Sequence, residues 1–75
     1  MLEQLQNVFR AVFQDGSLII SETTTAKNIK MWDSLMHLEL IAAVETAFKV
    51  EFSFNEVMSF NDVGDIMKVI EQKLK

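Results

Sequence analysis

The 75-residue chain contains no cysteine and no proline, and it has only two glycines, Gly16 and Gly64. Without cysteine it can form neither a disulfide nor a thiolate metal site. The lack of proline and the scarcity of glycine favour helix wherever the hydrophobic periodicity supports it. No apolar run approaches the roughly 20 residues of a membrane span, and the start lacks the basic region of a secretory signal. We therefore expect one small domain without a membrane span, located in the cytoplasm.

Basic side chains are scarce in the middle of the chain, where only Lys49 lies between residues 33 and 65. Nucleic-acid binding requires clustered lysine and arginine, so no nucleic-acid partner is expected. An acidic middle instead points to basic partner proteins attracted over a distance. The alternative is that the acids only keep a small domain soluble. The acids of this segment are Asp33, Glu39, Glu45, Glu51, Glu56, Asp62 and Asp65.

Hydrophobic periodicity predicts three long helices and one short one. The predicted ranges are residues 2–13, 33 to 48 or 49, 55–59, and from about 62 onward. Together they give an all-α fold, a small four-helix bundle with a long loop between helices one and two. The apolar stripe of the last helix consists of Val63, Ile66, Met67, Val69, Ile70 and Leu74.

The connection between the first two helices is long for so small a domain. Gly16 is expected to end the first helix in a left-handed conformation. Residues 17–32, rich in threonine, are then expected to be irregular. A loop of this length suggests a functional role, and structured packing is the alternative. The residues expected to anchor it on the core are Leu18, Ile19, Ile20 and Ile29.

The second helix is expected to begin with Asp33 as its N-cap and Ser34 at its first helical position. A serine there presents its hydroxyl to solvent, close to free backbone N–H groups and the positive end of the helix dipole. This setting suits a phosphodiester. By itself, an Asp-Ser pair at a helix start usually indicates only a cap.

Apolar side chains occur on both faces of the second helix. On a helical wheel of about 100° per residue, one half carries no full charge and predicts the core face. The other half mixes apolar and acidic residues beside Ser34, which predicts a docking surface. Scattered exposed leucines are also common on monomers. We call this second set the Leu35–Glu45 strip; it comprises Leu35, Leu38, Glu39, Ala42 and Glu45.

The sequence Trp32-Asp33-Ser34-Leu35 resembles the attachment motif of acyl carrier and peptidyl carrier proteins, in which the serine of Asp-Ser-Leu receives 4′-phosphopantetheine. Residues 38–41, 44–52 and 60–66 are similar to later parts of the same family pattern. The resemblance covers essentially the whole chain, in order. It implies a single acyl carrier domain over residues 1–75.

The resemblance also implies roles for individual residues. Ser34 would be the modified hydroxyl, and Asp33 would help to hold Mg²⁺ and coenzyme A in the complex with the modifying transferase. No metal would be bound by the carrier itself. The helical wheel places Ile41 on the edge of the core, although the resemblance implies a partner-facing position. The implied partner-facing residues are Leu35, Leu38, Glu39, Ile41, Ala42 and Glu45.

A member of this family would carry acyl groups as thioesters on the phosphopantetheine arm, without catalytic activity of its own. The implied partners are a phosphopantetheinyl transferase, an acyl-loading ligase or acyltransferase, and the synthases of one pathway. That pathway can make fatty acids, polyketides, amino-acid derivatives or a polysaccharide substituent. The chain's short length and its ends favour a free-standing carrier, although a domain excised from a larger synthase would look similar. A monomer is expected. Met36 and Thr46 replace acids common in the family, so its acidic surface is thinner.

Three other interpretations of the sequence compete with this one. An enzyme pairing Ser34 with His37 is disfavoured because the wheel turns His37 toward the core, where it is expected to pack between helices. Asp62 and Asp65 lack the alternating oxygen ligands of a calcium loop and are expected to be helix-start residues. The more serious rival is an unmodified helical adaptor that binds a partner through the Leu35–Glu45 strip.

Overall fold

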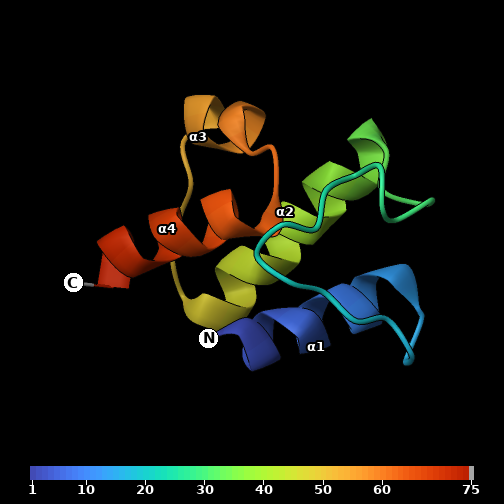
Figure 1. The fold of residues 1–75 in the computed structure, drawn as a ribbon. Helices are drawn as coiled ribbons and strands as arrows, with labels where there is room; N and C mark the ends of the chain where they lie inside the picture. Colours follow the sequence, from blue (N-terminus) through green and yellow to red (C-terminus); the bar gives the residue numbers. More distant parts are fainter. Residues whose placement is uncertain (75) are drawn as a thin grey trace.

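In a computed structural model, which describes residues 1–74, the chain folds into four helices (Figure 1). An isolated bridge between Thr25 and Asp62 is the only β pairing among these residues. The predicted all-α fold is therefore confirmed. The short helix begins one residue earlier than expected. The helices are α1 (Leu2–Phe13), α2 (Ser34–Phe48), α3 (Phe54–Ser59) and α4 (Val63–Leu74).

The core lies between α1, α2 and α4, whose apolar stripes pack against one another. Burial of these side chains is the main favourable contribution to folding. Leu74 was predicted to belong to the α4 stripe, but it is 56% exposed because it is the last helical residue and extends beyond the core. The fully buried side chains are Leu5, Phe9, Leu40, Val44, Val63, Ile66 and Ile70.

The end of α1 differs from the prediction. Gln14, with φ 52°, adopts the left-handed conformation, and no glycine has a positive φ. The N–H of Asp15 donates to Arg10 O at 3.0 Å, which satisfies a carbonyl at the helix end. Asp15 Oδ1 accepts hydrogen bonds from the N–H and the hydroxyl of Ser17. The helix thus ends at Gln14, and Gly16 lies in the turn that follows, in which Leu18 N donates to Asp15 O at 3.2 Å.

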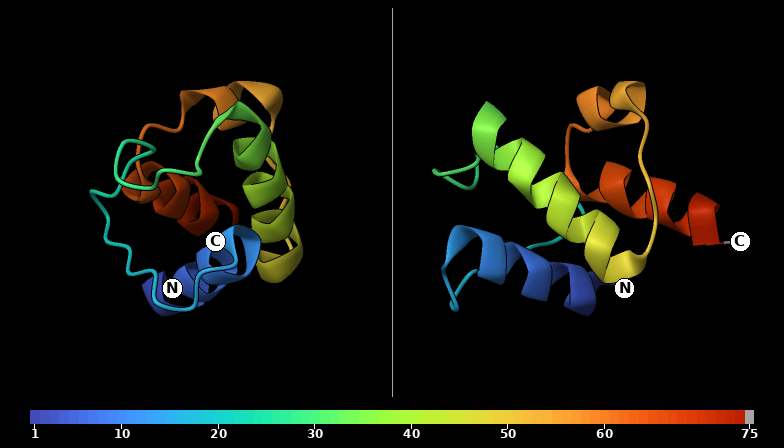
Figure 2. Two further views of the ribbon diagram at one scale, coloured as in Figure 1. Left: turned by 90° about the vertical axis from the view of Figure 1, so that its right-hand side faces the viewer. Right: turned by 180° about the vertical axis from the view of Figure 1, so that it is seen from behind.

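The loop between α1 and α2 runs along one side of the bundle (Figure 2). Ile20 and Ile29 are buried, and Leu18 is half-buried, as predicted for anchors. The prediction for Ile19 was wrong, because its side chain is 79% exposed. Successive residues of an extended segment point to opposite sides, so Ile19 faces outward where Ile20 faces inward.

Hydrogen bonds fasten this loop to two helices. Gln6 Oε1 on α1 accepts from Ile20 N at 2.9 Å. At the start of α4, Val63 N donates to Thr24 O at 2.9 Å, and Gly64 N donates to Glu22 O at 2.8 Å. The loop is therefore a packed part of the fold, and it delivers the chain to the start of α2.

Candidate functional site

Ser34 is the first residue of α2 and is exposed to solvent. Asp33 precedes it with extended backbone angles, and its Oδ1 accepts from Met36 N at 2.9 Å. This is the N-cap arrangement that the sequence predicted. It leaves the Ser34 hydroxyl beside the first backbone N–H groups of the helix, where the dipole favours negative charge.

A hollow of about 520 Å³ opens beside Ser34. Residues from the start of α2 form one wall, and residues from α3 form the facing wall. Most of the lining side chains are apolar, which suits a ligand that is largely hydrocarbon. The lining residues are Ala26, Trp32, Asp33, Ser34, His37, Leu38, Phe54, Val57, Met58, Phe60 and Asn61.

His37 joins the walls of this hollow. The indole N–H of Trp32 donates to His37 Nδ1 at 3.0 Å. Because an indole nitrogen can only donate, Nδ1 must be the acceptor, and the ring proton must reside on Nε2. His37 Nε2 then donates to Val57 O on α3, also at 3.0 Å. One imidazole thus ties the segment before Ser34 to the short helix.

This arrangement confirms that His37 packs between helices, and it argues against a catalytic role. Both of its nitrogens are engaged, so neither is free to accept a proton from the Ser34 hydroxyl. The ring is also stacked on Trp32, with centroids 5.9 Å apart, and contacts Phe60 edge-on. The pairing of Ser34 with His37 as nucleophile and base therefore has no geometric support.

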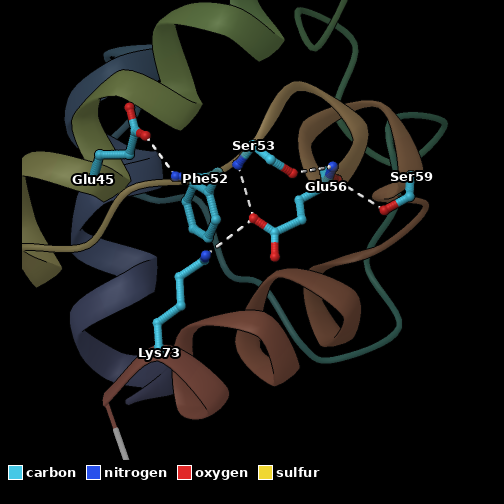
Figure 3. A network of polar contacts seen from close by, with 6 residues as sticks. All are labelled: Glu45, Phe52, Ser53, Glu56, Ser59 and Lys73. Carbon is cyan, nitrogen blue, oxygen red and sulfur yellow. Dashed lines mark hydrogen bonds and ion pairs between the residues drawn. The ribbon is translucent and has the colours of Figure 1, made fainter.

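Polar contacts fix α3 at its N-terminal end (Figure 3). Ser53 and Glu56 form a reciprocal capping box, in which each side chain accepts from the other residue's backbone N–H. Lys73 Nζ of α4 lies 3.0 Å from Glu56 Oε1. Before the helix, Phe52 N donates to Glu45 Oε2 at 2.8 Å, which ties the connecting segment to α2.

The environment of Glu56 favours its charged form. The hydrogen bond from the backbone N–H of Ser53 lowers the pKa of the Glu56 carboxyl below its ordinary value of 4.5, and the bond from Lys73 adds to this effect. Hydrogen bonds to a carboxylate and a neighbouring cation both stabilise the anion. Glu56 therefore serves α3 as an ionised cap.

The structure reproduces the two predicted faces of the second helix except at Ala47, which the wheel places in the uncharged core half and which is exposed near the end of the helix. Leu35, Leu38, Glu39 and Ala42 are exposed on the same helix as Ser34, and Glu45 is half-buried. Ile41 is only 5% exposed. It therefore lies inside the fold, as the helical wheel predicted, and not on the surface that the resemblance implied for it.

The acidic middle of the chain is largely engaged in the protein's own structure. Five of its seven carboxylates accept hydrogen bonds from backbone N–H groups, mostly at helix starts. Because these oxygens already accept hydrogen bonds within the protein, they are less available to pair with basic side chains of a partner. Asp62 and Asp65 have the helix-start role that was expected of them. The five are Asp33, Glu45, Glu56, Asp62 and Asp65.

Sequence reasoning missed the contribution of α3 to this site. Phe54, Val57 and Met58 line the hollow, yet the short helix was predicted without any role. The capping-box pattern Ser53-x-x-Glu56 was the available signal for where it begins. The bond between His37 and Val57 joins residues twenty positions apart, and no local pattern indicates it.

Within the residues that the structure describes, no group of three or more histidine, cysteine or acidic side chains is arranged to hold a metal ion. No helix in residues 1–74 is long and apolar enough to cross a membrane.

Comparisons with known proteins agree with this site. A family model described as the phosphopantetheine attachment site matches residues 3–70. The solution structure of a holo acyl carrier protein from Geobacter metallireducens matches with a TM-score of 0.90 and 37% sequence identity, covering 97% of this chain and 84% of that one. No curated protein matches the sequence. The chain therefore belongs to the acyl carrier protein family, whose prosthetic group is phosphopantetheine.

Proposed function

We propose that Ser34 is the residue that carries 4′-phosphopantetheine, and that residues 1–75 act as one acyl carrier domain. The observation that carries this proposal is the position of Ser34: exposed, first in α2, capped by Asp33 and beside an apolar hollow. A phosphodiester at this oxygen meets the positive end of the helix dipole. The residues present therefore fit the group.

The residues around Ser34 would act by positioning the prosthetic group and the groups that deliver it. Asp33 Oδ1 is used in capping α2, and its second oxygen is proposed to face Mg²⁺ and coenzyme A in the transferase complex. The apolar side chains of the hollow lie within reach of whatever Ser34 carries. When bound, the arm supplies a thiol that holds acyl groups as thioesters.

The carrier itself would have no catalytic activity; its single imidazole, His37, has both nitrogens engaged and is not available to activate Ser34. Its task would be to present acyl intermediates to the enzymes of one pathway, such as fatty acid or polyketide synthesis. A tethered acyl group has a high effective concentration at each docked active site. The proposed partners are a phosphopantetheinyl transferase, an acyl-loading ligase or acyltransferase, and synthases.

Intact-mass spectrometry tests the attachment site. The purified chain is incubated with coenzyme A, Mg²⁺ and a broad-specificity phosphopantetheinyl transferase. We expect the mass of one phosphopantetheine to be added to the wild type and to Ser17→Ala, which removes another exposed serine. We expect no addition to Ser34→Ala.

Two results would contradict the proposal. Modification of Ser34→Ala would place the arm elsewhere. No modification of the wild type by several transferases would favour the unmodified adaptor that binds through the Leu35–Glu45 strip.

A further inference from the structure

His37 is bonded to both of the residues that lead into Ser34. Its Nδ1 accepts from the indole N–H of Trp32 at 3.0 Å, and its backbone N–H donates to Asp33 O at 2.8 Å. The first turn of a helix is held less firmly than its interior, because its N–H groups lack backbone partners. The bond between Trp32 and His37 therefore adds a side-chain brace where the backbone of α2 is weakest.

Trp32 connects this brace to the three-helix core. Its side chain is only 7% exposed, and its ring meets Phe9 edge-on, with centroids 5.3 Å apart, and Phe13 at 6.3 Å. Its backbone N–H donates to Ile29 O at 3.0 Å. Trp32 cannot turn without disturbing these contacts, so the position of α1 is transmitted through Trp32 and His37 to the start of α2.

The hydrogen bond does more than the ring contact beside it. The rings of Trp32 and His37 are stacked with centroids 5.9 Å apart, and a phenyl ring at position 37 would retain that contact. A hydrogen bond adds a preferred distance and angle. Without it, a largely buried N–H has no partner, which costs free energy. Trp32 would then turn toward another acceptor and shift Asp33 and Ser34 with it.

We propose that Trp32 and His37 are positioning residues for the transfer of phosphopantetheine to Ser34. This inference rests on the proposed function. In the transfer, the Ser34 oxygen forms a bond to the phosphorus that bears pantetheine in coenzyme A. The bond from that phosphorus to adenosine bisphosphate breaks, and the hydroxyl proton is released to solvent. Because a misplacement of about 1 Å can lower such a rate about 100-fold, the direction of the hydroxyl matters.

Four variants separate the two bonds of the imidazole. His37→Phe removes both, and Trp32→Phe removes the indole donor while keeping a ring in the core. His37→Asn places its amide oxygen near the Nδ1 position and keeps an acceptor for Trp32. His37→Gln, one methylene longer, reaches toward the Nε2 position and keeps the donor to Val57 O. Ile70→Val is the control for general destabilisation, since Ile70 is fully buried in α4 and does not line the hollow.

Each variant is mixed with coenzyme A, Mg²⁺ and an excess of a broad-specificity phosphopantetheinyl transferase, and one turnover is followed by intact mass. Circular dichroism verifies folding. We expect the rate constant at saturating transferase to fall about tenfold in His37→Phe, Trp32→Phe and His37→Gln. The half-saturating concentration should change less than about twofold, because the exposed side chains around Ser34 are intact.

The remaining variants identify the bond responsible. His37→Asn should recover the rate to within about threefold of wild type, and Ile70→Val should stay within about twofold. The double variant of Trp32→Phe and His37→Phe should be no slower than either single variant, because both remove the same bond.

Hydrogen exchange of the Trp32 indole N–H, followed by NMR, gives a second measurement that needs no transferase. The indole proton should exchange slowly in the wild type and in His37→Asn. It should exchange faster in His37→Phe and in His37→Gln, where the acceptor at the Nδ1 position is missing.

Equal rate constants for His37→Phe and Ile70→Val would overturn the inference. A change confined to the half-saturating concentration would also overturn it, because docking would then be the affected step. So would a His37→Asn variant that is slow although its indole proton stays protected. If Ser34 is modified at the same rate in every variant, only the positioning role fails. If the wild type is never modified, the proposed function itself fails.

Discussion

The three-helix frame and the short helix α3 are held in place by different forces. In the frame, α1, α2 and α4 bury seven fully enclosed apolar side chains against one another. In α3, Val57 is the buried side chain, and the helix is positioned by a capping box, an ion pair and the bond from His37. Both regions meet at the hollow beside Ser34.

The three-helix frame therefore supplies most of the stability, whereas α3 is the region that can open locally. Buried apolar contacts are numerous and are lost only when the protein unfolds, whereas a few polar contacts near the surface can open locally. The wall of the hollow formed by α2 is therefore part of the rigid frame. The wall formed by α3 should therefore open locally more readily than the wall formed by α2.

Leu40→Ala should have the largest effect, because it acts on the frame. Leu40 is fully buried in α2, and its truncation leaves a cavity among packed side chains. We expect the free energy of unfolding to fall by about 3 kcal/mol. Urea unfolding followed by circular dichroism measures the change. The matched control is Leu38→Ala on the exposed face, which should cost less than about 0.5 kcal/mol. Equal losses would refute the division of α2 into two faces.

His37→Phe should come next, because it cuts the link between the frame and α3. The ring volume is retained, but Trp32 Nε1 and Val57 O lose their hydrogen-bond partner. We expect a loss of about 2 kcal/mol in unfolding free energy. Amide hydrogen exchange of α3 should accelerate more than that of α4. His37→Gln retains a donor and an acceptor and should recover part of the loss; no recovery would argue that ring packing alone matters.

Gly64→Ala tests how the loop is fastened to the frame. A Cβ at this position would lie 3.0 Å from Glu22 O and 3.2 Å from Asp62 Oδ1. Glu22 O is also the acceptor for Gly64 N at 2.8 Å, so it cannot move away without weakening that bond. We expect a net loss of about 1 kcal/mol despite the better helix propensity of alanine. The thermal unfolding midpoint measures it, and an increase would show that the loop adapts freely.

The smallest effect is expected from the ionised cap of α3. The pKa of Glu56 is lowered in the folded protein, so its carboxylate contributes stability above the ordinary value of 4.5, and this contribution is lost as the pH falls through the lowered value. Wild type should exceed Glu56→Gln in thermal midpoint at about pH 7, and the difference should shrink as the pH falls below 4.5. Lys73→Met removes only the second cause and should show a smaller difference. A gap that persists in acid would place the effect elsewhere.

The sequence predicts the frame well because its signals are local. The cap at Asp33 and the stripes of α1, α2 and α4 depend on spacings of three and four residues, and the helix bounds agree closely. The errors at Gly16, Ile19 and Leu74 all lie at or beyond helix ends, where periodicity no longer constrains orientation.

The candidate site was predicted in part for the same reason. The exposed Ser34 and the strip on α2 follow from one helix and its wheel. The facing wall, formed by α3, cannot be predicted from a single helix. It closes the hollow through a contact between His37 and Val57 that only the tertiary fold creates. Resemblance to the family supplied residue roles, but burial excludes Ile41 from the surface.

Trp32 gives the protein a built-in optical reporter. It is the single tryptophan of the chain, it lines the hollow, and it stands two residues before Ser34. Its indole N–H donates to His37 Nδ1. Indole emission shifts with the polarity around the ring and with the partner of its N–H. Loading and unloading of the carrier should therefore be visible as a change in intrinsic fluorescence, without any attached dye.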